Sequence, residues 1–288
     1  MSEILADAMV IDDAQRAPLR IATLHSAGDL KSRWNQADLL VPEDRQGSNY
    51  VAGFANSDRC VDLALRLRYE VFNVELGEGL AQSSVTGHDR DEFDEQMTHI
   101  VLYHNPTGRI VGTYRTQTID HAFRNKGIYA SQLFQLGPIE PYFPKTIELG
   151  RACLAQDHRS LQAILALWTG IGDFMNLFDQ KYLFGCCSLT TQDPDDGWRA
   201  MKTIRAKGHL HPELFVSAQP THKCGLPTRE FDADLGPAIR LPKLFRTYMG
   251  LCAKVVSEPA IDRDFGTVDF LILMNGKQVN LSKLDIIK

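Results

Sequence analysis

Hydrophobic positions along the chain follow two periods, one typical of helices and one typical of strands. In DRCVDLALRLRYEVFNVELG the apolar residues recur at helical spacing, which predicts a helix over about 59–74 with Asp58 as its N-cap. In THIVLYHNPTGRIVGTYRTQT, residues 98–118, two apolar runs flank an Asn-Pro-Thr-Gly turn, which predicts an antiparallel hairpin. The chain therefore combines helices with paired strands.

The second half of the chain alternates strands and helices. KTIELGRACLA (145–155) and YLFGCCSL (182–189) have the apolar character of buried strands, and residues 160–180 between them carry an apolar stripe at helical spacing. This order predicts a strand, a crossover helix and a parallel strand. PKLFRTYMGLCAKV (242–255) predicts a further helix, and VDFLILMN (268–275) predicts a closing strand. The fold class is therefore α+β, a mixed α/β layer with a central mixed sheet flanked by helices.

Composition describes an ordinary globular protein. Residues 1–50 are polar and weakly periodic, so we expect an N-terminal extension before a main domain of residues 51–288. With 288 residues, 44% of them hydrophobic and 23% charged, the chain can bury a large core. The net charge of −5 gives no reason to expect nucleic acid as a partner.

The cysteines and the N-terminal segment indicate the cellular compartment. The six cysteines include no CxxC pair, which is typical of reduced thiols in a cytoplasmic protein. The N-terminus lacks a basic segment followed by an apolar one, and no apolar run approaches the ~18 residues of a membrane helix. We expect a cytoplasmic protein, and any contact with the inner membrane would be peripheral.

One predicted strand carries two opposite charges in an apolar run. Glu148 and Arg151 would point to opposite faces of a regular strand, because side chains alternate. Gly150 between them is a position where a β-bulge is tolerated, and one bulge returns both side chains to the same face. They would then border a cleft that freed backbone N–H groups also face. A buried structural ion pair is the alternative.

Several segments, in their order and separations, resemble the acyl-homoserine lactone synthases and their relatives, the N-acyl amino acid synthases and the ornithine lipid N-acyltransferases. Four of them are LRYEVFNVELGEG, DRDEFDEQMTHIVLY, IVGTYRTQT and IELGRACLAQDHR. YLFGCCSL, KGHLHPELF and EPAIDRDFGTVDFLIL are most similar to the ornithine lipid branch. The resemblance covers residues 60–275 and implies a GNAT-like acyltransferase fold.

The resemblance implies an enzyme that moves a long-chain (3-hydroxy)acyl group from an acyl carrier protein to the α-amine of an amino acid. The ornithine lipid branch favours L-ornithine as this acceptor and lipid biosynthesis as the pathway. VELGEG stands where the lactone synthases have a tryptophan, which argues against lactone formation. The alternatives are a lactone synthase that uses S-adenosylmethionine, another N-acyl amino acid synthase, and a non-catalytic module that binds acyl carrier or lipid.

Site residues follow from the same resemblance. It places Glu148, Arg151 and Arg115 in catalysis, and Glu148 is the candidate base for the attacking amine. Backbone N–H groups along the bulged strand would stabilise the thioester oxyanion. The other residues expected at the substrate are Arg68, Phe72, Asp91, Asp94, Ala152, Cys153 and Leu154.

Asp91 and Asp94 lie in the run DRDEFDE, which composition alone describes as a solvated turn. With the resemblance they become partners of the three arginines or contacts for the cationic end of the substrate. Arg115 lies in an apolar strand and needs a carboxylate, either from one of these acids or from the amino acid substrate.

The turn after residues 145–155 indicates the acyl donor. GNAT acetyltransferases have a glycine-rich loop there that holds the pyrophosphate of coenzyme A, whereas AQDHRSLQ has no glycine. The single phosphate of acyl-phosphopantetheine fits better, and His158 and Arg159 would meet it unless they form an exposed polar cap. We expect this group as a co-substrate, with no bound cofactor and no metal.

The basic stretches RAMKTIRAKGHLH and RLPKLFRTYMGLCAK would dock the acidic carrier protein or form ordinary solvated helix faces.

Two further features have two interpretations each. Cys153 near His158 invites a nucleophilic thiol, but a lone strand cysteine is more often a small buried hydrophobe. Trp168, Phe174 and Phe178 form either core or the wall of an acyl tunnel.

Overall fold

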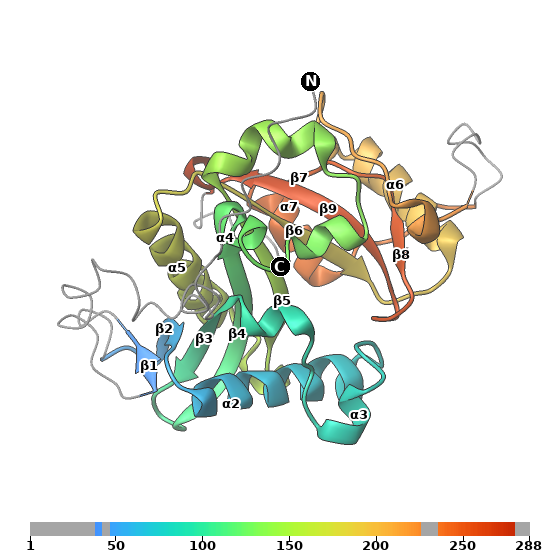
Figure 1. The fold of residues 1–288 in the computed structure, drawn as a ribbon. Coiled ribbons are helices and arrows are strands. Elements are labelled where there is room, and N and C mark those ends of the chain that lie inside the picture. Colours follow the sequence, from blue (N-terminus) through green and yellow to red (C-terminus); the bar gives the residue numbers. More distant parts are fainter. Residues whose placement is uncertain (1–37, 42–46, 226–235, 280–288) are drawn as a thin grey trace.

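A computed structural model describes residues 38–41, 47–225 and 236–279, which are arranged around one mixed sheet (Figure 1). The sheet has nine strands in the order β1-β2-β3-β4-β5-β6-β9-β7, with β8 beside β9. Only β5 and β6 pair in parallel among these strands. The strands are β1 (Leu39–Leu40), β2 (Tyr50–Ala55), β3 (Thr98–His104), β4 (Arg109–Thr118), β5 (Thr146–Leu154), β6 (Tyr182–Leu189), β7 (Lys254–Val255), β8 (Ala260–Asp262) and β9 (Thr267–Asn275).

Helices cover both faces of the sheet, because its strands are apolar on both sides. Helix α5 (Leu161–Leu177) packs its apolar stripe over β2 and β3, on the face of Ile100. On the opposite face α2 (Asp58–Tyr69) packs Ala64 against Val101. None of the helices in the described ranges has the length and apolar character needed to cross a bilayer. The other helices are α3 (Ser83–Thr86), α4 (Ile119–Phe123), α6 (Pro194–Ala206) and α7 (Lys243–Gly250), with short turns η4 (Glu70–Glu75), η5 (Glu92–Glu95), η6 (Tyr129–Gln132), η7 (Gly137–Lys145), η8 (Gln156–His158), η9 (Pro220–His222) and η11 (Gly276–Gln278).

The main predicted elements are confirmed. Strands β3 and β4 form the hairpin, and Gly108 in its turn has a φ of 65°, a conformation that favours glycine. Strand β5, helix α5 and strand β6 form the predicted crossover with a parallel pair. The predicted last strand is β9, which pairs with β6. The predicted α+β class with a mixed central sheet is therefore correct.

The first helix differs in detail from the prediction. Ser57, and not Asp58, is the N-cap, because its hydroxyl accepts from the N–H of Cys60 while Asp58 is already helical. After Tyr69 the α-helix changes into the π-helical turn η4, which was not predicted. This turn carries Phe72.

Strand β2 and helix α6 were not predicted. The helix begins with Asp193 as its cap and Pro194 at its first position, a signal that the sequence does carry. Most of the predicted extension, residues 1–50, lies outside the described residues. Within its described part, Leu39 and Leu40 pair with the far end of β2.

Candidate active site

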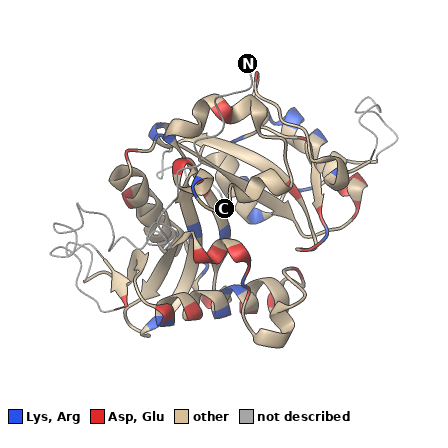
Figure 2. Cartoon of the chain, in the orientation of Figure 1, with Lys and Arg blue, Asp and Glu red and all other residues tan. Residues whose placement is uncertain are grey.

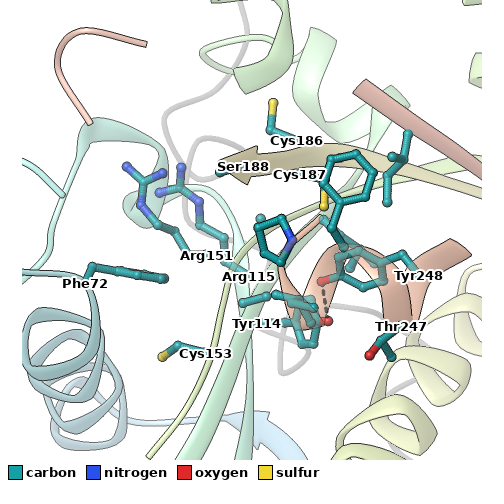
Figure 3. Close-up of a pocket in the computed structure, with 18 of the residues that line it drawn as sticks. Phe72, Tyr114, Arg115, Arg151, Cys153, Cys186, Cys187, Ser188, Thr247 and Tyr248 are labelled. Carbon is teal, nitrogen blue, oxygen red and sulfur yellow. Dashed lines mark hydrogen bonds between the residues drawn. The ribbon is translucent and has the colours of Figure 1, made fainter. Parts of the chain in front are cut away.

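The neighbouring strands β5 and β6 separate partway along their length. They pair from Thr146 with Tyr182 to Leu149 with Gly185, and no further pair joins them in the described residues. Gly185 permits this last approach, because a Cβ there would overlap the carbonyl oxygen of Leu149. A cavity of about 410 Å³ opens where the strands diverge (Figure 3).

The cavity reaches both faces of the sheet. Tyr114 and Arg115 are consecutive on β4 and therefore point to opposite faces, yet both line the cavity. Figure 3 shows the guanidinium groups of Arg115 and Arg151 on one side and Tyr114 with Tyr248 on the other. The hydroxyls of these two tyrosines are hydrogen-bonded at 2.7 Å. One end of the cavity is therefore charged and the other is largely apolar.

A β-bulge shapes the charged end. Arg151 and Ala152 of β5 together lie opposite one residue of β4, Tyr114, so the ladder is interrupted there. Arg151 has a φ of 51°, in the left-handed region that side chains disfavour. The predicted bulge is confirmed, but the left-handed residue is Arg151 and not Gly150. Such a conformation persists only where its surroundings hold it.

Those surroundings are a closed ring of ion pairs between α2, the segment 89–94 that leads into η5, β4 and β5, where Figure 2 shows charges of both signs close together. Each of three arginines binds two of three aspartates, so charges alternate around the ring. Arg68 bridges Asp89 and Asp94 (2.6 Å), Arg115 bridges Asp94 (3.1 Å) and Asp91, and Arg151 bridges Asp91 (2.9 Å) and Asp89 (3.1 Å). The prediction that Asp91 and Asp94 pair with these arginines is confirmed, and the solvated-turn alternative is wrong for both.

The ring is buried and its charges balance. Arg68 and Asp89 are both fully buried. Burial opposes the ionisation of Asp94, but the charges of Arg68 and Arg115 outweigh it and hold the pKa of Asp94 well below its usual range. Asp91 also caps η5 by accepting from the N–H of Phe93. The ring thus ties the strained strand to the rest of the fold.

Glu148 lies beside the ring but outside it. Its carboxylate accepts from the backbone N–H groups of Tyr129 (3.0 Å) and Ala130 (2.8 Å) and from the amide of Gln117 (2.8 Å). Among the ion pairs of the described residues none joins Glu148 to Arg151, so the alternative of a structural pair between them is wrong. Burial raises the pKa of Glu148, although the three donors oppose the shift. A buried carboxylate with a raised pKa at a cavity wall is suited to accept a proton.

Arg115 keeps one donor unused. Its Nη1 donates to Asp91 and Asp94, whereas its Nε has no hydrogen-bond partner in the described part of the chain. A Cβ at Gly150 would lie 3.7 Å from this Nε, so the missing side chain leaves space beside it. Because both residues line the cavity, an anion bound there would satisfy the donor.

The apolar end resolves two open interpretations. Trp168 lines the cavity with its ring 6.1 Å from that of Tyr248, whereas Phe174 is fully buried in the core. The aromatic stripe therefore supplies both a wall and core. Burial raises the pKa of the Cys153 thiol, which keeps it protonated and makes it a poor nucleophile.

The remaining predicted residues occupy different places. Phe72, Ala152 and Leu154 line the cavity with Cys153. Arg159 also lines it and binds the carboxylate of Glu75 at 2.7 Å. His158 is buried and hydrogen-bonded at 2.9 Å to the hydroxyl of Tyr50. In the described ranges no group of His, Cys, Asp and Glu side chains could hold a metal ion.

Sequence reasoning missed the third acid of the ring and two acids of the cavity. Asp89 precedes the two predicted acids, and the count of three arginines against two acids was the signal that could have found it. Glu78 and Asp269 line the cavity. An acid inside the apolar strand VDFLILMN was the signal for Asp269.

A family model described as an acetyltransferase (GNAT) domain matches residues 67–169, a range that contains the whole ring of ion pairs. Residues 67–169 therefore match a GNAT domain, and the mixed sheet has the fold that the resemblance implied.

Curated relatives narrow the class. The L-ornithine N(alpha)-acyltransferase of Rhodobacter capsulatus is 28% identical over 79% of this chain and 90% of the relative. The L-ornithine N(alpha)-acyltransferase of Rhizobium meliloti is 27% identical over 94% of this chain and 90% of the relative. The solved structure of FeeM, an N-acyl amino acid synthase from uncultured soil microbes, has a TM-score of 0.47 and 13% identity over 81% of this chain and 97% of that chain. The curated relatives confirm the predicted resemblance and the predicted enzyme class, an N-acyltransferase.

Proposed function

We propose that this chain transfers a long-chain (3-hydroxy)acyl group from the phosphopantetheine arm of acyl carrier protein to the α-amine of L-ornithine, in ornithine lipid biosynthesis. The observation that carries the proposal is the cavity between β5 and β6, apolar at one end and charged at the other. A thioester lying across the gap would place its chain beside Trp168 and Tyr248 and its carbonyl beside the bulge. The names of the two bacterial relatives support ornithine as the acceptor.

The transfer exchanges a C–S bond for a C–N bond. The lone pair of the uncharged α-amine attacks the thioester carbonyl, and the tetrahedral intermediate collapses with loss of the pantetheine thiolate. Glu148 accepts the amine proton directly or through a water, and a proton returns to the thiolate, so that the products are an amide and a free thiol. The bulge leaves backbone N–H groups near Ala152 to stabilise the oxyanion. Arg115 and Arg151, held rigidly by the ring, orient the reacting groups.

The donor is an acyl-phosphopantetheine co-substrate, and no resident cofactor is required. Arg159 lines the cavity at the turn that precedes α5, where the arm's phosphate would be met. Lys243 at the start of α7 also lines the cavity and is exposed, so it would give the acidic carrier a basic contact. The product is an amphiphile made in the cytoplasm, which a peripheral contact would pass to the inner membrane.

The experiment is an assay of the purified chain with 3-hydroxyacyl carrier protein and a panel of free amino acids. Thiol release is followed while the product is identified by mass, and the same acyl group on coenzyme A serves as the matched donor control. An Nα-acyl ornithine formed faster from carrier protein than from coenzyme A supports the proposal. A lactone formed with S-adenosylmethionine, or no turnover across the panel, refutes it.

A further inference from the structure

Three buried acids, two that line the charged end of the cavity and one close to them, are not balanced by the ring. Glu78, Asp262 and Asp269 are 8%, 6% and 3% exposed. No ion pair in the described part of the chain includes any of them, whereas the ring matches three aspartates with three arginines. Buried carboxylates are normally paired. This end of the cavity therefore carries acids that have no paired cation among the described residues.

Among these acids, Asp269 has an unpartnered carboxylate oxygen. It lies on β9 beside Ser188 of β6, and both residues line the cavity with Glu78. Its Oδ1 has no hydrogen-bond partner among the described residues. Burial raises the pKa of Asp269 to about 7, and the charges of Asp262 and Glu78 contribute to the rise, which a hydrogen bond from Ser188 opposes. A cation bound in the cavity would supply the positive charge that the described residues do not pair with Asp269.

A second, independent group indicates what kind of cation. The Nε–H of Arg115, on a side chain that is 1% exposed, is an unpaired donor at the same charged end. An anion would accept a hydrogen bond from this donor, whereas a cation would pair with the carboxylates of Asp269 and Glu78. A ligand that satisfies both carries a carboxylate and an ammonium on one small molecule.

We propose, building on the proposed function, that Asp269 and Glu78 bind the side-chain ammonium of a diamino acid acceptor while Arg115 Nε binds its α-carboxylate. Asp262, which accepts from the hydroxyl of Tyr129 at 3.4 Å, adds negative charge close to Asp269. With both ends held, the uncharged α-amine is presented toward Glu148. A neutral amino acid leaves the two acids unpaired, so the site selects acceptors that have a second amine.

L-Norvaline tests this selection, because it is L-ornithine without the side-chain amine. Binding of each amino acid is measured by calorimetry at pH 7.5 in the presence of an acyl-pantetheine whose thioester is replaced by an unreactive amide. We expect ornithine to bind about 10- to 100-fold more tightly than norvaline, the worth of a charge-assisted hydrogen bond. Asp269→Asn should reduce this preference to less than about threefold, and Glu78→Gln should reduce it to a smaller extent.

Asp264→Asn is the matched control, since Asp264 is exposed near the turn between β8 and β9 and does not line the cavity. Equal binding of the two amino acids by the wild-type chain, no ornithine binding, or full ornithine preference in Asp269→Asn overturns the inference. Selective ornithine binding without amide formation in the turnover assay would refute the proposed function and leave this inference standing. Turnover with equal rates for ornithine and norvaline would refute this inference and leave the proposed acyl transfer to ornithine standing.

Discussion

Replacing Asp89 by asparagine tests whether the ring of ion pairs holds the active-site strand. Asp89 is fully buried and accepts from both Arg68 and Arg151, so the change removes one charge and leaves three guanidinium groups to share two aspartates. Breaking a buried ion pair by removing one partner destabilises a protein by about 3–5 kcal/mol. Asparagine keeps the shape of the side chain, so the loss reports charge and not packing.

The assay is urea unfolding, with Asp120→Asn as the matched control. Asp120 and its partner Arg124 are 72% and 63% exposed, and such a pair contributes about 0–1 kcal/mol. The folded-state pKa of Asp94 is lowered, so the stability that the ring supplies is present above the unfolded pKa of about 3.9 and is lost as the pH falls through the folded value. The deficit of Asp89→Asn should therefore persist from pH 8 to pH 5 and shrink in stronger acid. A deficit no larger than that of Asp120→Asn would refute the reasoning.

Four further predictions follow from individual residues. Glu148→Gln should lower turnover by about 10²- to 10⁴-fold if it is the base, and turnover within threefold of wild type would remove it from that role. Cys153→Ala should keep turnover within about tenfold of wild type, because its thiol is protonated; a complete loss would instead indicate an acyl-enzyme. Gly185→Ala should lower stability by about 1–3 kcal/mol because its Cβ would overlap backbone, whereas Gly172→Ala, with open space around it, should not; equal melting temperatures would contradict this. The raised pKa of Asp269 supplies stability at low pH that is lost as the pH rises through about 7, so Asp269→Asn should be more stable than wild type at pH 8 by about 1–3 kcal/mol and similar at pH 4; a variant less stable at pH 8 would contradict the assignment.

The sheet could be predicted where the apolar pattern was long and its turns were explicit. The hairpin followed from an Asn-Pro-Thr-Gly turn, and the parallel crossover followed from a helical stripe between two apolar runs. Strand β2 was missed because its six residues adjoin a polar segment without periodicity. Helix α6 was missed because its many charged residues indicated only a solvated surface segment, although Asp193 and Pro194 carry the signal for a helix start.

Only the ion pairs of the site could be predicted, because a buried charge needs a partner of opposite charge. Arg115 in an apolar strand required an acid, and Asp91 and Asp94 were near enough in sequence to be considered. The closure of the ring through Asp89 depends on the path of the chain between α2 and η5, which no local pattern specifies. A bulge was expected at Gly150, but tertiary ion pairs place the left-handed residue at Arg151.

The most direct test of the account is a crystal structure of the chain with an acyl-pantetheine whose thioester is replaced by an amide. We expect the carbonyl to lie beside Gly150 and Ala152, within hydrogen-bond reach of a backbone N–H, and the acyl chain to run toward Trp168 and Tyr248. A ligand bound away from the gap between β5 and β6, or an acyl chain directed toward the ring of ion pairs, would contradict it.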